Sequence, residues 1–109
     1  DLYALAGIAY RALTGRPPFA GEEVGKLLIY VLTKMPEAPS ALAPLPVEVE
    51  LVLALGLAKK RMHRFERVED FARALRRAAR GALDDDTRAR GWILVKQQPW
   101  GATVPAPKG

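Results

Sequence analysis

The sequence of 109 residues predicts an all-α fold. Apolar residues recur every three or four positions in four separate stretches, which is the period of a helix with one buried face. Glycine and proline residues stand between these stretches and end them. Half of the residues are hydrophobic, so the composition is that of a globular domain with one core rather than of a disordered chain.

The first predicted helix covers residues 1–14 and is apolar on almost every side. Only Asp1 and Arg11 carry charge in it. A helix of this composition is normally buried, and it is shorter than the roughly 20 residues needed to cross a membrane. Gly15 suits the left-handed position that ends a helix, and two prolines follow it. The main apolar stripe consists of Leu2, Leu5, Ala9, Ala12 and Leu13.

The second predicted helix covers residues 22–35, and its two leading glutamates lie where the helix dipole favours acids. Its apolar stripe consists of Val24, Leu27, Leu28, Val31, Leu32 and Met35. Residues 36–46 contain four prolines and predict an extended connection. Residues 47–58 begin V-E-V-E-L, which alternates as a strand does. The later apolar spacing, and the charges at the two ends, fit a helix, which we therefore predict.

The fourth predicted helix starts near Val68 and ends before Gly81. Arg67 precedes it where a capping serine or threonine is often found, so we expect a weakly capped start. Its two faces differ sharply in character. One carries Val68, Phe71, Ala72, Leu75, Ala78, Ala79 and Ala82, and the other carries Arg73, Arg76, Arg77 and Arg80.

The last part of the chain changes character. Three aspartates, residues 84–86, offer an N-cap for a short helix that runs to about Lys96. The residues that can dock this helix are Trp92, Ile93, Leu94 and Trp100. Residues 102–109 contain two prolines and no periodicity, as in a linker. We expect residues 1–83 to form one helical unit, and residues 84–109 to form a short helix and a tail.

The composition excludes several kinds of site. Without cysteine the chain has no disulfide and no thiolate metal site, and its one histidine cannot form a histidine cluster. His63 is expected to be a solvated turn residue. No signal peptide or membrane-spanning stretch is evident, so we expect a cytoplasmic protein. The first residue is aspartate rather than methionine, which fits a fragment or a processed chain. The net charge of +5 permits nucleic-acid binding, but a solvated arginine face explains it more simply.

Three short motifs, taken in order, resemble a known family. They are D-L-Y-A-L at residues 1–5, T-G-R-P-P-F at residues 14–19, and L-A-K-x-x-x-x-R-F. The last motif consists of Leu57, Ala58, Lys59, Arg64 and Phe65. Together with the order of helices, they resemble helices F to I in the large lobe of bacterial Hanks-type serine/threonine protein kinases. The resemblance covers about residues 1–83 and rests on order and spacing rather than on one motif.

The resemblance implies a role for two residues. Asp1 matches the acid that accepts hydrogen bonds from the catalytic loop, although an acid here can equally be a helix N-cap. Arg64 matches the arginine that pairs with the glutamate of the A-P-E motif, and a guanidinium suits a carboxylate. The resemblance also implies that the helix at residues 22–35 contributes to docking of a protein substrate. The parent enzyme would transfer the γ-phosphate of ATP to serine or threonine with Mg²⁺.

The motifs that carry this chemistry are not in the sequence. It has no glycine-rich loop, V-A-x-K lysine, H-R-D, D-F-G or A-P-E motif. We therefore predict that this chain alone is inactive and binds neither ATP nor metal. It also departs from the family pattern at Ala6 with Gly7, at Arg11, at Lys60 with Arg61, and at Arg67. A non-catalytic helical interaction module, such as a pseudokinase remnant, stays open, and a basic nucleic-acid binder is the less favoured alternative.

Overall fold

The computed structural model describes residues 1–21 and 23–104, and within them the all-α prediction is confirmed. The expected end of the linker, residues 105–109, lies outside the described residues. The helices are α1 (Leu2–Thr14), α2 (Val24–Thr33), α3 (Val47–Gly56), α4 (Val68–Ala79) and α5 (Asp85–Gln97), with short 3-10 turns η1 (Pro39–Ala41) and η2 (Arg61–His63). No helix in the described ranges is long and apolar enough to cross a membrane.

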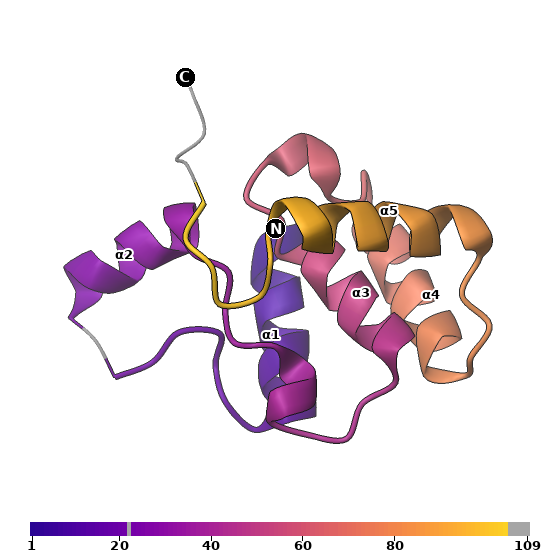
Figure 1. The fold of residues 1–109 in the computed structure, drawn as a ribbon, viewed down its shortest axis with the longest axis horizontal. Helices are drawn as coiled ribbons and strands as arrows, with labels where there is room; N and C mark the ends of the chain where they lie inside the picture. The colour runs from indigo at the N-terminus through magenta and orange to yellow at the C-terminus, as the bar shows by residue number, and fades with distance from the viewer. Residues whose placement is uncertain (22, 105–109) are drawn as a thin grey trace.

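Helix α3 lies at the centre of the molecule (Figure 1). It packs against α5, α4 and α1, and it contributes to both apolar clusters of the core. Helix α2 stands apart at one side, and the last described segment of the chain passes close to its end. The four other helices therefore form the body of the protein, and α2 is attached to it.

The stretch that fits both a strand and a helix is helical in the structure. Residues 51–59 are buried without a break. A helix pairs the buried backbone N–H and C=O groups of such a stretch within itself, whereas a strand would need a neighbouring strand. The two glutamates of V-E-V-E-L find partners at the edge of the core. Glu48 forms an ion pair with Arg88 at 2.9 Å, and Glu50 accepts a hydrogen bond from the backbone of Ser40 at 2.9 Å.

Two glycines let the helices approach α3 closely. A Cβ atom on Gly56 would lie 2.7 Å from the Cβ of Ala6 and 2.8 Å from the ring of Phe71. A Cβ atom on Gly91 would lie 2.8 Å from the Cβ of Leu51. Real atoms cannot approach this closely, so α1, α4 and α5 reach α3 only because these positions have no side chain.

Helix α1 is less buried than its composition indicates. Its ends match the sequence prediction, since the Asp1 side chain caps the first turn and Gly15 ends the helix with φ 81°. Only Ala6 and Tyr10 are buried in it, and Ile8 is 66% exposed. The described residues cover only the face of α1 toward α3, α4 and η1.

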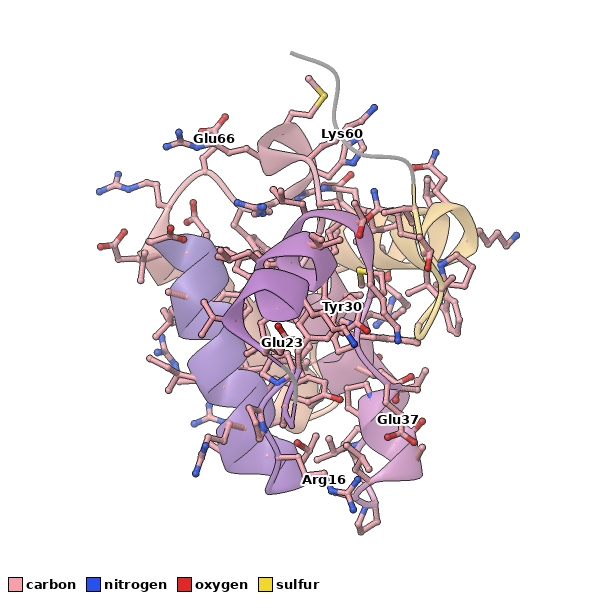
Figure 2. The ribbon with its side chains drawn as sticks, turned by 90° about the vertical axis from the view of Figure 1, so that its left-hand side faces the viewer. Arg16, Glu23, Tyr30, Glu37, Lys60 and Glu66 are labelled. Carbon is pink, nitrogen blue, oxygen red and sulfur yellow. The ribbon has the colours of Figure 1, made fainter. Side chains whose placement is uncertain are left out.

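Helix α2 also differs from its prediction. It is shorter than predicted, and all ten of its residues are described and none is buried. Leu28, Ile29 and Leu32 are more than half exposed. Figure 2 looks at the molecule from the side where α2 lies, with Tyr30 on it. Met35 is fully buried, but it lies beyond the end of the helix.

Helices α4 and α5 agree with the sequence more closely. Phe71 faces the core from α4, and Arg67 provides no side-chain cap, as predicted. Asp84 caps α5 by accepting hydrogen bonds from the backbone and hydroxyl of Thr87 at 3.0 and 2.9 Å. Leu94 docks α5. The other expected docking residues of α5 itself, Trp92 and Ile93, are 45% and 56% exposed, because α5 turns them away from α3.

The close contact of α5 with α3 predicts the effect of a single methyl group. Gly91→Ala should lower the urea midpoint of helix loss, because overpacking a tight core contact costs about 1–3 kcal/mol. Gly25→Ala is the matched control. Gly25 is an exposed helical glycine with nothing within 4 Å of an added Cβ, so alanine should be neutral or stabilise by about 0.5–1 kcal/mol. Equal midpoints for the two variants would contradict the close crossing.

Candidate functional site

The two site residues expected from the sequence lie near the same end of α1. The carboxylate of Asp1 accepts a hydrogen bond from the backbone of Ala4 at 3.2 Å and is exposed. Arg64 follows η2, and the central carbon of its guanidinium lies 4.9 Å from the ring centroid of Tyr3, in the first turn of α1. The structure thus places Arg64 against the helix that Asp1 caps.

The guanidinium of Arg64 is held by backbone carbonyls. Its Nε donates to the oxygen of Ala58 at 2.7 Å, and a terminal nitrogen lies 3.4 Å from the oxygen of Lys59. Burial lowers the pKa of Arg64 from its ordinary value. Among the described residues it forms no ion pair with a carboxylate. A half-buried guanidinium in this state can receive an acidic group without first breaking an ion pair.

The sequence did not predict that the side chain of Lys59, next to Arg64, is buried. It is only 7% exposed, and its Nζ donates to the hydroxyl of Tyr3 at 3.2 Å and to the oxygen of Val31 at 3.0 Å. The same nitrogen lies over the rings of Tyr3 and Phe19, at 5.3 and 5.4 Å from their centroids. Burial, and then the charge of Arg64, lower the pKa of Lys59 to about 8. Its place directly after the uninterrupted apolar run of α3 was the one signal in the sequence.

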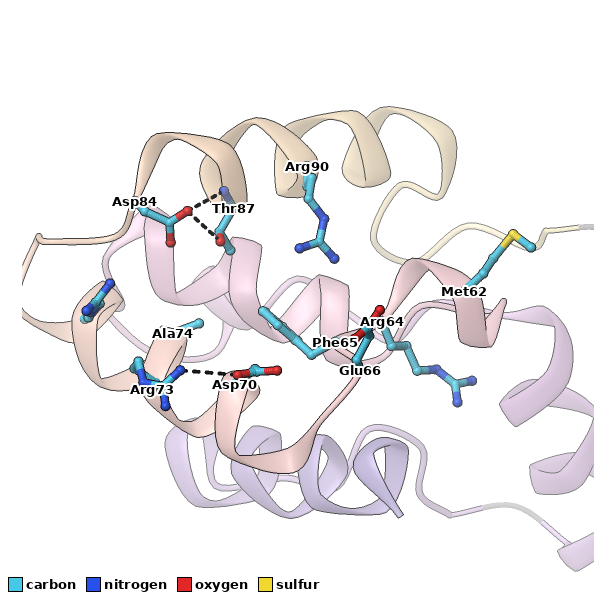
Figure 3. Close-up of a pocket in the computed structure, with 11 residues that line it drawn as sticks. Met62, Arg64, Phe65, Glu66, Asp70, Arg73, Ala74, Asp84, Thr87 and Arg90 are labelled. Carbon is cyan, nitrogen blue, oxygen red and sulfur yellow. Dashed lines mark hydrogen bonds and ion pairs between the residues drawn. The ribbon is translucent and has the colours of Figure 1, made fainter.

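A polar pocket of about 540 Å³ lies between α4, α5 and the segment after η2 (Figure 3). Arg90 reaches into it from α5 and lies 5.5 Å from the ring centroid of Phe65. Arg73 is paired with Asp70 at 3.2 Å. The guanidinium of Arg64 is directed away from the space between α4 and α5. The pocket therefore mixes acids and bases and does not gather the two expected site residues.

Two buried polar atoms lack a hydrogen-bond partner among the described residues, namely Nδ1 of His63 and Nε1 of Trp100. His63 does lie in a turn, but the expectation that it is solvated is wrong for this nitrogen. Within the described ranges, no group of three or more histidine or acidic side chains is placed to hold a metal ion. The arrangement of Arg64 and the groups around it can bind a carboxylate and hold the neighbouring helices in position.

An apolar groove runs between α1 and α4 and reaches the start of α3. Two open pockets of about 330 and 360 Å³ form it, and they share Ala9, Leu75 and Ala79. Leu13 lines one of them and Leu5 the other. We call this surface the α1–α4 groove. A continuous apolar surface of this kind is typical of a face that another part of a protein covers.

The search of family models matched none of them to this chain. Curated relatives were found among bacterial kinases. The serine/threonine-protein kinase PknF of Mycobacterium tuberculosis is 38% identical over 96 residues, which are 87% of this chain. The kinases PknH and PknE of the same organism are 35% and 33% identical over 108 residues, which are 98% of this chain.

The chain spans only a small part of these relatives, namely 20% of PknF, 16% of PknH and 18% of PknE. The similarity nevertheless runs through almost the whole chain, including α5, and agrees with the helical order that the sequence motifs indicate. The chain is therefore homologous to one helical segment of the bacterial Hanks-type serine/threonine protein kinases.

Proposed function

We propose that this chain is the C-terminal part of the large lobe of a protein kinase that transfers the γ-phosphate of ATP to serine or threonine. The observation that carries the proposal is the similarity to three such kinases over 87–98% of the chain. In this role the segment supplies support and docking surfaces, and the rest of the kinase domain binds ATP and Mg²⁺ and supplies the phosphoryl-transfer groups.

The surroundings of Arg64 support its role as an anchor. A guanidinium held by two carbonyls and a tyrosine ring is oriented before its acidic partner arrives, which lowers the entropy lost on pairing. We propose that this partner is a glutamate at the end of the activation segment. We propose in addition that Asp1 holds the catalytic loop, since its carboxylate is exposed and, among the described residues, Ala4 donates to only one of its oxygens.

The α1–α4 groove is the surface on which we propose that the rest of the kinase domain packs. Leu13, which lines the groove, is 36% exposed, and Ile8 on the same helix is 66% exposed. Helix α2 presents a separate exposed apolar face, which suits a protein substrate. A pseudokinase remnant would use the same surfaces, and intact H-R-D and D-F-G motifs upstream of Asp1 would exclude it.

The isolated chain should not bind Mg-ATP, because the sequence has neither the phosphate-binding loop nor the metal-binding acids. Isothermal titration calorimetry with Mg-ATP, and a kinase assay with a generic protein substrate, are the measurements. Saturable binding at micromolar nucleotide would show that the chain itself carries a nucleotide site.

In the full-length parent, Arg64→Ala should lower kinase activity and loosen the activation segment. Removing one partner of a fully buried ion pair costs about 3–5 kcal/mol, and the half-buried position of Arg64 predicts a smaller loss. Activity and the melting temperature measure the effect. Arg61→Ala, an exposed neighbour in η2, is the control and should leave both unchanged. Equal behaviour of the two variants would remove Arg64 from the proposed anchor.

The isolated chain should bind a hydrophobic dye or self-associate through the α1–α4 groove, since each large apolar side chain left in water costs about 1.5–3 kcal/mol. Its helix content should persist. Leu13→Lys should reduce both effects, because it places a charge in the groove at a position that is already 36% exposed. Met62→Lys, at an 80% exposed position on η2, is the control. A strict monomer that binds no dye would count against a covered face.

A further inference from the structure

Helix α2 is held to the body of the protein almost entirely at its last turn. None of its side chains is buried, and only Leu27 and Tyr30 among its apolar residues are half-buried. The carbonyls at a helix C-terminus lack partners within the helix and must find donors elsewhere. The contacts that fix α2 are therefore expected among the donors to these carbonyls.

Two sets of donors reach the end of α2. One comes from the last described segment, where the backbone of Val104 donates to the oxygen of Thr33 at 2.6 Å. The other is the side chain of Lys59, whose Nζ lies 3.0 Å from the oxygen of Val31 and 3.5 Å from that of Tyr30. Lys59 is thus the side chain that joins α2 directly to the end of α3.

The charged and titratable groups around Lys59 include no acid among the described residues. Tyr3 faces it from α1 at 3.2 Å, and Arg64 faces it from the segment after η2. The end of α2 brings Tyr30 and, just beyond it, Lys34, whose Nζ lies over the Tyr30 ring at 4.9 Å. From the end of α5 comes only the neutral side chain of Gln98, which accepts from the backbone of Lys59. The side chain of Lys59 is thus a buried cation beside another cation.

We propose that Lys59 is the positioning residue of α2, that its side-chain nitrogen attaches the last turn of the helix to the body, and that loss of its proton tightens this attachment. The proposal does not depend on the function proposed above. The neutral amine keeps two N–H groups for the carbonyls of Tyr30 and Val31 and can accept the hydroxyl proton of Tyr3. It no longer carries the cost of a buried charge.

The direction of the pH effect follows from proton linkage. In the attached state burial, and then the charge of Arg64, lower the pKa of Lys59 from 10.5 to about 8. We expect detachment of α2 to expose the ammonium and raise this pKa toward 10.5. Between these two values the attached state binds fewer protons, so attachment strengthens as pH rises through this window. Below about pH 8 both states are protonated and pH has no effect. Burial raises the pKa of Tyr3, so its hydroxyl remains a donor there.

The experiment measures the position of α2 by electron–electron double resonance between two spin labels. The chain has no cysteine, so Leu28→Cys on α2 and Glu69→Cys on α4, both exposed, give a unique labelled pair. Dilution with unlabelled protein suppresses signals between molecules. We expect the ratio of attached to detached α2 to rise on the order of tenfold between pH 7.5 and 9.5. A ratio that is independent of pH, or that falls, would overturn the proposal.

Three variants distinguish the effect of the Lys59 amine on α2 from the general effect of a substitution. Lys59→Met should broaden the distance distribution at both pH values, because it removes the donor. Lys59→Arg should remove the pH dependence, because a guanidinium stays charged. Lys60→Met, at the exposed neighbouring position, should behave as the wild type. A narrow distribution in Lys59→Met, or the wild-type pH response in Lys59→Arg, would contradict the proposal.

A measurement on the wild-type chain guards against a variant that fails to fold. Carbon-13 NMR of the lysine ε-carbons gives the pKa of Lys59 directly, with the Lys59→Met spectrum used only for assignment. A titration near pH 8 is expected. A titration above pH 10 would show that the nitrogen is not buried at the end of α2 and would overturn the proposal.

Discussion

The close crossing of helices at α3 is the constraint on which the rest of the structure depends. Helix α3 is covered by α1 and α4 on one side and by α5 on the other, so it takes part in both core clusters. Gly56 and Gly91 set the distance at these crossings. Because α3 has no exposed face along residues 51–58, the register of every neighbouring helix is determined by how it fits against α3.

The packing of α3 also brings two positive charges together at its C-terminal end. The apolar run carries Lys59 into a buried position, and the turn that follows returns Arg64 to the same place, beside Tyr3. Each cation is satisfied by carbonyl and hydroxyl oxygens. Such a pair of positive charges is costly to bury and favours the approach of an acid or the loss of a proton. The end of the tightly packed helix α3 therefore also holds two neighbouring cations.

The surfaces of the chain fit a segment that works inside a larger protein. The α1–α4 groove lies between α1 and α4 and reaches the start of α3, and α2 presents its apolar residues to solvent. The kinase relatives are about five to six times longer than the stretch they share with this chain. Helix α1 is more apolar than its burial in these 109 residues requires, and this composition is expected where further parts of a domain cover the helix.

The sequence alone determined the helices, several of their ends and the kinase resemblance, because periodicity and end signals are local. Gly15 and Asp84 act as predicted, and the relatives are bacterial serine/threonine protein kinases. The roles of Asp1 and Arg64 toward absent partners stay predictions. Only the tertiary structure decided which apolar faces are buried, that α3 rather than α1 is the central helix, and that Lys59 lies beneath α2. These features depend on contacts between residues far apart in the chain, and a local apolar pattern does not specify its partner.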